Sequence, residues 1–417
     1  MRVHLAYGRY GLDLDLPGQV TVLERRPVPG LADEAASIRE ALRRPLASAP
    51  LAESVRPGDR VAIVFSDITR PMPNDRVLPV LLAELAHVPE GNITLINALG
   101  SHRTNTPDEL RRMLGSAIMS RYRVIQHDAW DASGLTSVGT SERGYPLLVN
   151  RHFLEADVRI LTGFVEPHFF AGYSGGPKAV LPGLAGIETI LHNHDFAMVA
   201  HPGATWLSCD SPMHREMERA AQLSGPSFLL NVTLNSRGEI SGVYAGDVIT
   251  AHTEACARVR RDCLLPVSRP FDVVVTSNGG YPLDLNLYQA VKGMSAAARI
   301  VRPGGAIVVV AECWDGLPNH GRYAALLAAA KDPAALLSRL ASLSEPVQDQ
   351  WQAQVQAQIQ QKADVYVYSG GLSEEQIRRA LLQPCLDVEA TVAQLVHEKG
   401  PRVAVLPEGP FSVPTLM

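Results

Sequence analysis

Polar side chains at the ends of three predicted strands are the first sign of chemistry in this sequence. Each of three short apolar runs is typical of a buried strand, and each is followed by a side chain that titrates or carries charge. These runs and side chains are residues 60–66 with Asp67 and Arg70, residues 93–99 with His102, and residues 157–164 with His168. Ligands bind beyond the carboxyl ends of strands in open α/β sheets. Any one of these residues could be a turn or cap, but together they predict a binding site.

The surroundings of these residues suggest what each could do. Arg70 precedes Pro71 and is held extended, which suits a bidentate grip on a carboxylate or phosphate. Asp67 could cap the turn, with Arg70 as its partner. His168 lies in an apolar loop, where burial favours the neutral form and makes it a candidate general base. A structural histidine explains that loop equally well.

Lysine is scarce, and Lys178 is the first in the chain. Lys and Arg together number 38, and only five of them are lysines. Arginine cannot act as an amine nucleophile, so a lysine kept in an arginine-rich chain can mark chemistry. The charged helical stretches around Lys331, Lys362 and Lys399 predict solvated side chains. Lys178, in a glycine turn, and Lys292 are therefore the candidates.

The glycine turn at 172–178 resembles a phosphate-binding P-loop only superficially. Its spacing is one residue short, Pro177 intervenes, and Ala179 replaces the hydroxyl residue that would bind magnesium. ATP hydrolysis is therefore not indicated, although the glycines allow close approach of a phosphate.

Two nearby histidines raise the question of a metal. His192 and His194 would diverge on a helix and could share an ion only on an extended segment. A zinc site usually needs three or four ligands, and the local set is His168, His192, His194 and Asp195.

The second half offers one more group of polar side chains. Asn286 is a predicted N-cap for a helix that carries Tyr288, Gln289 and Lys292. The spacing places these three side chains close together on the helix surface. The alternative that Lys292 is an ordinary surface lysine stays open.

Strand and helix patterns alternate along the chain, which predicts an α/β fold. We expect two domains with mostly parallel sheets flanked by helices and the active site in the cleft between them. Two prolines at 264–271 mark a break, so the predicted domains are 1–266 and 267–417, and the last segment can pack back on the first. Further strands are predicted at 272–277, 306–312, 364–369 and 402–407, and helices at 74–88, 107–122, 251–265, 322–343, 351–363 and 373–382.

Composition narrows the functional class. The net charge is −5, so no nucleic-acid surface is indicated. We see no signal peptide and no apolar stretch long enough for a membrane span. The five cysteines contain no CxxC pair. A reduced, cytoplasmic protein is the simplest expectation.

Longer motifs connect these residues to a known family. The chain resembles the lactate racemase family over nearly its whole length. The resemblance rests on DITRP (67–71), GSHR (100–103), EPHFFAGYSGGPKAVLPG (166–183), HNHD (192–195) and LYQAVKG (287–293), in this order. The central motif is highly specific, whereas DITRP alone is not.

The resemblance implies a cofactor and a role for each matched residue. Family members use a nickel-pincer nucleotide, a pyridinium-3-thioamide-5-thiocarboxylic acid mononucleotide with nickel, joined covalently to the lysine that matches Lys178. His194 matches the nickel ligand, and His102 and His168 match the acid/base pair. The remaining matches are Asp67, Thr69 and Arg70 as cofactor and substrate contacts, and Tyr288, Gln289, Lys292 and Trp351 as substrate-binding positions.

The implied activity is racemisation or epimerisation of a 2-hydroxy acid, lactate or a related one, by reversible hydride transfer. The Cα–H of such an acid is too weakly acidic for a histidine to remove, and no side chain accepts hydride, so a cofactor must. Cofactor-biosynthesis enzymes are the implied partners. Two alternatives stay open: a protein that binds or stores the cofactor, and a zinc hydrolase using His168, His192 and His194.

Overall fold

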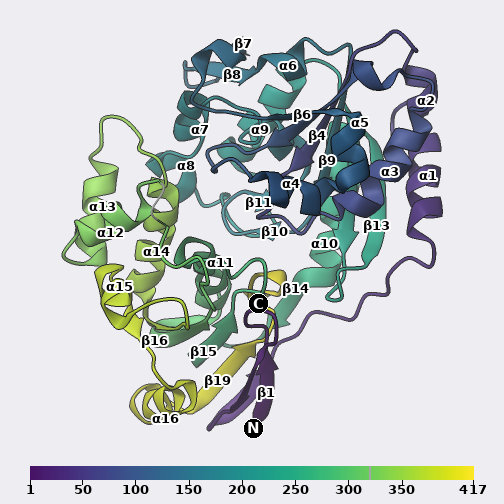
Figure 1. The fold of residues 1–417 in the computed structure, drawn as a ribbon. Coiled ribbons are helices and arrows are strands. Elements are labelled where there is room, and N and C mark those ends of the chain that lie inside the picture. The colour runs from purple at the N-terminus through teal and green to yellow at the C-terminus, as the bar shows by residue number, and fades with distance from the viewer. Residues whose placement is uncertain (319–320) are drawn as a thin grey trace.

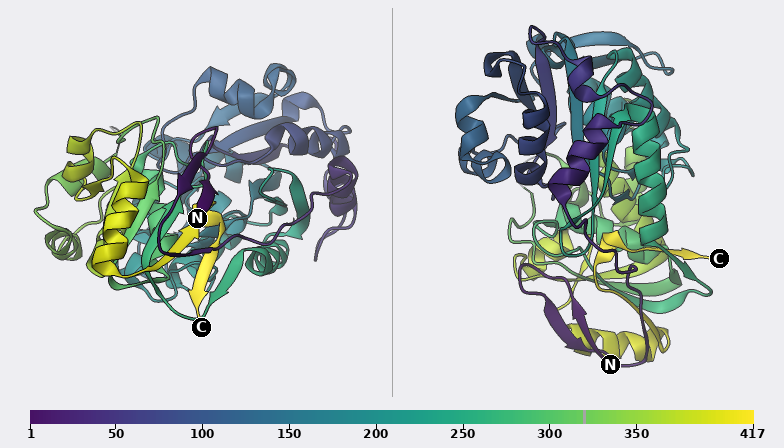
Figure 2. Two further views of the ribbon diagram at one scale, coloured as in Figure 1. Left: turned by 90° about the horizontal axis from the view of Figure 1, so that it is seen from below. Right: turned by 90° about the vertical axis from the view of Figure 1, so that its right-hand side faces the viewer.

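Two six-stranded sheets organise a computed structural model that describes residues 1–318 and 321–417. They form two lobes, one above the other in the view of Figure 1. In the side view of Figure 2, helices lie on both sides of the upper sheet. The fold is α/β with mostly parallel sheets flanked by helices, as the sequence predicts.

The upper sheet carries the first three predicted strands. Its central strands are mainly apolar and mostly buried, which is typical of parallel strands covered on both faces. Only β13 runs antiparallel to its neighbour. In spatial order the strands are β13 (Ile240–Asp247), β12 (Phe228–Leu234), β9 (Val158–Phe164), β4 (Val61–Ser66), β5 (Ile93–Ala98) and β6 (Arg123–Gln126).

The lower sheet is entirely parallel and contains the four later predicted strands. Its order is β18 (Gln383–Pro384), β17 (Ala363–Tyr368), β16 (Val301–Val310), β15 (Phe271–Ser277), β19 (Arg402–Leu406) and β3 (Gln19–Val22). The strand β3 falls within the predicted first domain, yet it pairs with β19. The chain therefore starts in the lower lobe, crosses to the upper lobe and returns. The domain limits at 1–266 and 267–417 stay a prediction.

The upper-lobe helices follow the predicted stretches with local differences. Gly115, at φ 78°, divides the predicted helix 107–122 in two. The helix that starts at Asn74 has no side-chain cap. The helices are α1 (Glu34–Arg43), α2 (Leu51–Ser54), α3 (Asn74–Glu84), α4 (Pro107–Leu114), α5 (Ser116–Arg121), α6 (Arg151–Leu154), α7 (Ile187–Asn193), α8 (Phe196–Ala200), α9 (Pro212–Leu223) and α10 (Val248–Cys263).

The lower-lobe helices include the two that face the cleft. A new N-cap at Asp332, followed by Pro333, divides the predicted helix 322–343. Ser373 and Gln376 form a capping box at the start of the predicted helix 373–382. These helices are α11 (Leu287–Ala298), α12 (Tyr323–Ala328), α13 (Pro333–Ala341), α14 (Gln350–Lys362), α15 (Glu374–Arg379) and α16 (Val388–Lys399). No helix in the described ranges combines the length and apolarity that a membrane crossing needs.

Short elements complete the fold. Four two-stranded sheets pair β1 (Arg2–Leu5) with β2 (Leu12–Asp15), β7 (Leu135–Thr140) with β8 (Pro146–Asn150), β10 (Pro167–His168) with β11 (Gly172–Tyr173), and β14 (Leu264–Val267) with β20 (Val413–Leu416) within the described residues. Four 3-10 turns are η1 (Glu90–Asn92), η2 (Ala132–Gly134), η3 (Gly176–Ala179) and η4 (Gly409–Phe411).

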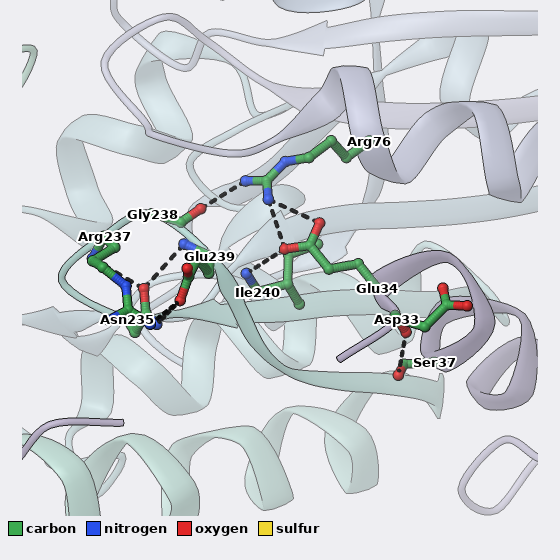
Figure 3. Close-up of polar contacts among 9 residues, drawn as sticks. All are labelled: Asp33, Glu34, Ser37, Arg76, Asn235, Arg237, Gly238, Glu239 and Ile240. Carbon is green, nitrogen blue, oxygen red and sulfur yellow. Dashed lines mark hydrogen bonds and ion pairs between the residues drawn. The ribbon is translucent and has the colours of Figure 1, made fainter. Parts of the chain in front are cut away.

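A polar network fixes the helix that follows the first strand end. Glu34 on α1 accepts hydrogen bonds from Arg76 Nη1 at 2.6 Å and from the Ile240 backbone N–H at 2.7 Å (Figure 3). Arg76 on α3 also donates to the Gly238 carbonyl at 2.7 Å. The network joins α1, α3 and the β12–β13 turn. Because α3 begins shortly after Arg70, it helps to hold the loop between β4 and α3 in place.

Candidate active site

A single cleft gathers the predicted site residues. One wall is formed by the carboxyl ends of β4, β5 and β9 and by the segment that follows β9, and the other by α11 and α14. Every predicted site residue except Thr69 lines it, namely Asp67, Arg70, His102, His168, Lys178, His194, Tyr288, Gln289, Lys292 and Trp351. Thr69 lines an adjoining hollow and supports the cleft through Asp67.

Asp67 and His102 form a pair that the sequence did not reveal. His102 Nδ1 lies 2.5 Å from Asp67 Oδ2, and Thr69 Oγ1 donates to Asp67 Oδ1 at 2.7 Å. Burial raises the pKa of Asp67, but His102, Arg70 and Thr69 outweigh burial and hold it below its usual value. The ionised carboxylate only accepts hydrogen bonds, so His102 Nδ1 is the donor. Neutral His102 therefore presents a lone pair on Nε2.

His168 sits in a very different setting. It is 6% exposed, and its ring stacks on Phe169 and meets Phe170 edge-on. The backbone N–H of Ala171 donates to Nδ1 at 3.2 Å, so the proton of the neutral ring is on Nε2. Burial, followed by the charges of Lys178 and Lys292, lowers its pKa well below the usual value. His168 is therefore neutral and presents an N–H on Nε2.

Lys178 lies on the 3-10 turn η3, and Pro177 separates it from Gly175 and Gly176, which both have positive φ. Asn231 Oδ1 accepts the Gly176 N–H at 2.8 Å and anchors this turn to β12. Burial, followed by the charges of Arg70 and Lys292, lowers the pKa of Lys178 well below its usual value, and Glu166 opposes the shift only in part. An amine with a depressed pKa is a nucleophile at neutral pH.

His194 is buried at the end of α7, beside the rings of Phe170 and Trp351. Its Nδ1 is buried and has no hydrogen-bond partner among the described residues. Burial, followed by the charge of Lys178, lowers its pKa to about 3. A neutral imidazole with a free ring nitrogen is what a metal ion requires of a histidine.

His192 diverges from His194, as helical geometry predicts. It stacks on Tyr145, with ring centroids 4.5 Å apart, and does not line the cleft. Across residues 1–318 and 321–417, no three His, Cys, Asp or Glu side chains are grouped closely enough to hold a metal. The geometry therefore gives no support to a zinc set of His168, His192 and His194.

The opposite wall is built by the first turns of α11. Asn286 caps the helix as predicted, accepting the Gln289 N–H at 3.1 Å. Trp351 Nε1 donates to the Tyr288 hydroxyl at 2.8 Å, which joins α14 to α11. Burial, followed by the charge of Arg70, lowers the pKa of Lys292 to about 7. The alternative that Lys292 is an ordinary surface lysine is wrong, since the residue is 7% exposed.

Two functional neighbours escaped the sequence reading. Glu166 is buried, and its Oε1 lies 3.8 Å from Arg70 Nη1, so Glu166 and not Asp67 forms the ion pair of Arg70. Its position two residues after β9 was the available signal. Gln352, beside Trp351, donates to the Tyr288 carbonyl and lines the cleft.

Comparisons with known proteins decide the family. Family models described as the lactate racemase N-terminal and C-terminal domains match residues 7–206 and 267–413. The lactate racemase of Thermoanaerobacterium thermosaccharolyticum is 33% identical over 417 residues, covering 98% of this chain and 97% of the relative. The chain belongs to the lactate racemase family.

Other lactate racemase relatives agree. The lactate racemase of Lactiplantibacillus plantarum is 34% identical over 382 residues, covering 90% of each chain. The solved lactate racemase apoprotein from T. thermosaccharolyticum is 31% identical, with a TM-score of 0.91 over 99% of this chain and 100% of that one. A Thermotoga maritima protein shares the fold at 20% identity and a TM-score of 0.69, over 92% of this chain and 98% of that one.

Proposed function

We propose that this protein racemises a 2-hydroxy acid, with lactate as the first substrate to test, using a nickel-pincer nucleotide joined to Lys178. The observation that carries the proposal is the meeting of Lys178, His194, His102 and His168 in one cleft. The names of the relatives support the same activity.

The cleft fits this cofactor on its own chemistry. Lys178 has the depressed amine pKa that a covalent attachment needs, and His194 has a buried ring nitrogen without a partner. Lys178 would hold the nucleotide and His194 would ligate the nickel, whose remaining soft ligands come from the cofactor. When bound, the group supplies an acceptor and donor of hydride.

The substrate carboxylate has two candidate partners on opposite walls. Arg70 Nη1 is buried and makes no hydrogen bond within the described residues, and its ion pair with Glu166 is long at 3.8 Å. Lys292 lies in the same cleft and supplies a second positive charge. An anion between them would offset the repulsion from Arg70, which after burial is the next cause of the lowered pKa of Lys292.

The two histidines handle the hydroxyl proton. His102 presents an Nε2 lone pair, and Asp67 stabilises the imidazolium that forms when it takes the proton. His168 presents Nε2–H toward its surroundings and accepts a proton there only if its Nδ1 bond to Ala171 is given up. The planar keto acid that forms turns between them, and the proton returns from the other side.

Aromatic side chains limit the access of water. Phe169, Phe170 and Trp351 line the cleft around His168 and His194 and are almost fully buried. A dry site strengthens the electrostatic hold of Arg70 and Lys292 on an anion.

The decisive experiment uses protein produced together with the cofactor-making enzymes. Intact mass and metal content are measured first, and enantiopure L-lactate is then followed by chiral chromatography. The proposal predicts a covalent adduct on Lys178, one nickel ion and the appearance of D-lactate. A panel of enantiopure 2-hydroxy acids, short, aromatic, dicarboxylic and sugar-derived, identifies the preferred side chain.

Each alternative has its own signature in that experiment. An unmodified chain with stoichiometric zinc would end the racemase proposal and favour the hydrolase. An adduct with nickel but no racemisation of any acid would favour storage, although storage gives no reason to keep both His102 and His168 in the cleft.

A further inference from the structure

A second group of reactive side chains lies behind the cleft and takes no part in the proposed reaction. It comprises two free cysteines, two histidines and a glutamate, which we call the thiol–histidine cluster: Cys209, His214, Glu218, His252 and Cys256. Its members come from α9, from α10 and from the segment before α9.

The cluster supports the turn that carries Lys178. His252 Nε2 donates to the Ser174 carbonyl at 2.9 Å. The His252 ring also lies directly against Gly176, where a Cβ atom would fall 2.3 Å from the His252 Cγ. Both α9 and α10 pack against η3. A shift of the His252 ring would therefore displace Gly176, which lies two residues before Lys178.

One thiol of the cluster is inside the protein and the other reaches the surface. Cys256 is buried, and its Sγ lies 3.4 Å from His252 Nε2. Cys209 is exposed, and its thiol lies beside both Cys256 and His214. An accessible cysteine with a buried cysteine behind it is the arrangement of an attacking and a resolving thiol.

His214 is a buried neighbour of the exposed thiol that favours its thiolate form. Its side chain is 1% exposed, its ring nitrogens make no hydrogen bond among the described residues, and Nε2 lies 3.5 Å from Glu218 Oε1. Burial lowers the pKa of His214, but Cys209 and Glu218 outweigh burial and raise it to about 9. Cys256 and His214 in turn lower the pKa of Cys209. The thiolate is the nucleophilic form of cysteine.

We propose that Cys209 and Cys256 form a peroxide-reactive dithiol whose oxidation to a disulfide alters the support of the Lys178 turn. The oxidant is a hydroperoxide, ROOH. This site is separate from the cleft, and the proposal does not depend on racemase activity.

The reaction balances in two steps. The Cys209 thiolate attacks the terminal peroxide oxygen, an S–O bond forms and the O–O bond breaks, and the departing alkoxide takes a proton from His214 to leave as ROH. The Cys256 sulfur then attacks the Cys209 sulfur, the S–O bond breaks, and the hydroxide leaves with the Cys256 proton as water. Two thiols and ROOH become one disulfide, ROH and water.

The disulfide changes what lies beneath Lys178. Bonding to Cys209 draws the Cys256 sulfur away from His252, which loses its 3.4 Å neighbour. The ring is then free to shift under Ser174 and Gly176. We expect the oxidised protein to exchange backbone amide hydrogens faster over residues 172–180 than the reduced protein does.

The test treats the reduced, cofactor-free chain with one equivalent of hydrogen peroxide and uses intact mass and peptide mapping. We expect the loss of two hydrogen atoms and a peptide linked through Cys209 and Cys256. Cys256→Ser should instead trap a sulfenic acid on Cys209 that dimedone labels, and Cys209→Ser should leave Cys256 reduced. Cys385→Ser is the matched control, because this buried cysteine lies in the lower lobe and its loss should leave the disulfide intact.

Three results would each overturn the proposal. We expect reduced Cys209 in the folded protein to react with iodoacetamide at pH 7 about tenfold faster than in the denatured chain. Equal rates would show that the thiol is not activated. A disulfide between the Cys209 residues of two molecules would remove Cys256 from the reaction. Unchanged hydrogen exchange at 172–180 after disulfide formation would refute the coupling to Lys178.

Discussion

His102 and His168 line the same cleft but meet opposite surroundings. The His102 side chain is 34% exposed and is bonded to a carboxylate. His168 is buried among aromatic rings, and its charged neighbours are the cations Lys178, Lys292 and Arg70. The Nδ1 of His102 donates, whereas the Nδ1 of His168 accepts. One histidine thus faces a carboxylate, and the other stays neutral among cations.

The two histidines obtain their Nδ1 hydrogen-bond partners from different parts of the fold. His102 follows β5 and contacts Asp67, which follows β4. Its partner therefore comes from the end of a neighbouring strand. His168 lies in the short β10–β11 hairpin, whose own backbone supplies the partner Ala171. A long-range contact therefore supplies the Nδ1 partner of His102, and a local contact supplies that of His168.

The largest expected effect comes from removing either imidazole. His102→Gln and His168→Gln should each lower racemisation by about 10²- to 10⁴-fold, because each loses one proton-transfer group. His192→Gln is the matched control and should keep most of the activity, since His192 stacks on Tyr145 outside the cleft. Chiral chromatography of loaded protein measures all three. Near-normal activity in either cleft variant would remove that histidine from the acid/base pair.

Asp67→Asn should weaken proton transfer by His102 and leave His168 unaffected. The amide cannot stabilise a His102 imidazolium, so kcat should fall by roughly a hundredfold while KM changes little. Nothing around His168 is altered. A comparable rise of KM without a fall of kcat would show that Asp67 binds substrate instead of positioning His102.

Lys292 gives the cleft a pH dependence of its own. Its pKa of about 7 means that its charge disappears as pH rises through neutrality. We expect kcat/KM to fall by up to about tenfold for each pH unit above 7, because a neutral amine no longer holds the substrate carboxylate. Lys292→Arg keeps its charge and should lose this alkaline limb, even if its overall activity is lower. The same limb in the arginine variant would assign it to another group.

The smallest effect concerns stability in acid. The folded pKa of His168 lies below its unfolded value near 6.5, so the unfolded chain binds more protons as pH falls. The free energy of unfolding should therefore drop below pH 6.5, by up to about 1.4 kcal/mol per pH unit for this residue. Urea unfolding of the cofactor-free chain at pH 6.5 and 5.5 should show a shallower drop for His168→Gln. Equal drops would mean that His168 is charged in the folded state.

The sequence predicted the elements better than their long-range partners. The apolar runs located β4, β5 and β9, and the strand-end rule brought Asp67, His102 and His168 to one cleft. The pairing of Asp67 with His102 was missed, because it joins residues 35 positions apart. Residue spacing within one element shows which side chains are neighbours, but it says nothing about which strands lie side by side.

Local sequence signals also had limits. Gly115 ends α4 and starts α5, although the hydrophobic pattern continues across it. The strand β3 joins the lower sheet from the far end of the chain, and its four residues contain no signal of that partner. The thiol–histidine cluster was invisible for the same reason, since Cys209 and Cys256 are separated by a helix, two strands and half of another helix.

The central claim is that Lys178 acts as an amine and not as a charge. The most direct measurement is the intact mass and nickel content of wild-type and Lys178→Arg proteins, each produced with the cofactor-making enzymes. The wild type should carry the nucleotide adduct and nickel, whereas the arginine variant should have the unmodified mass, little nickel and no racemase activity. An arginine variant that retains the nickel cofactor tightly and turns over normally would contradict the account.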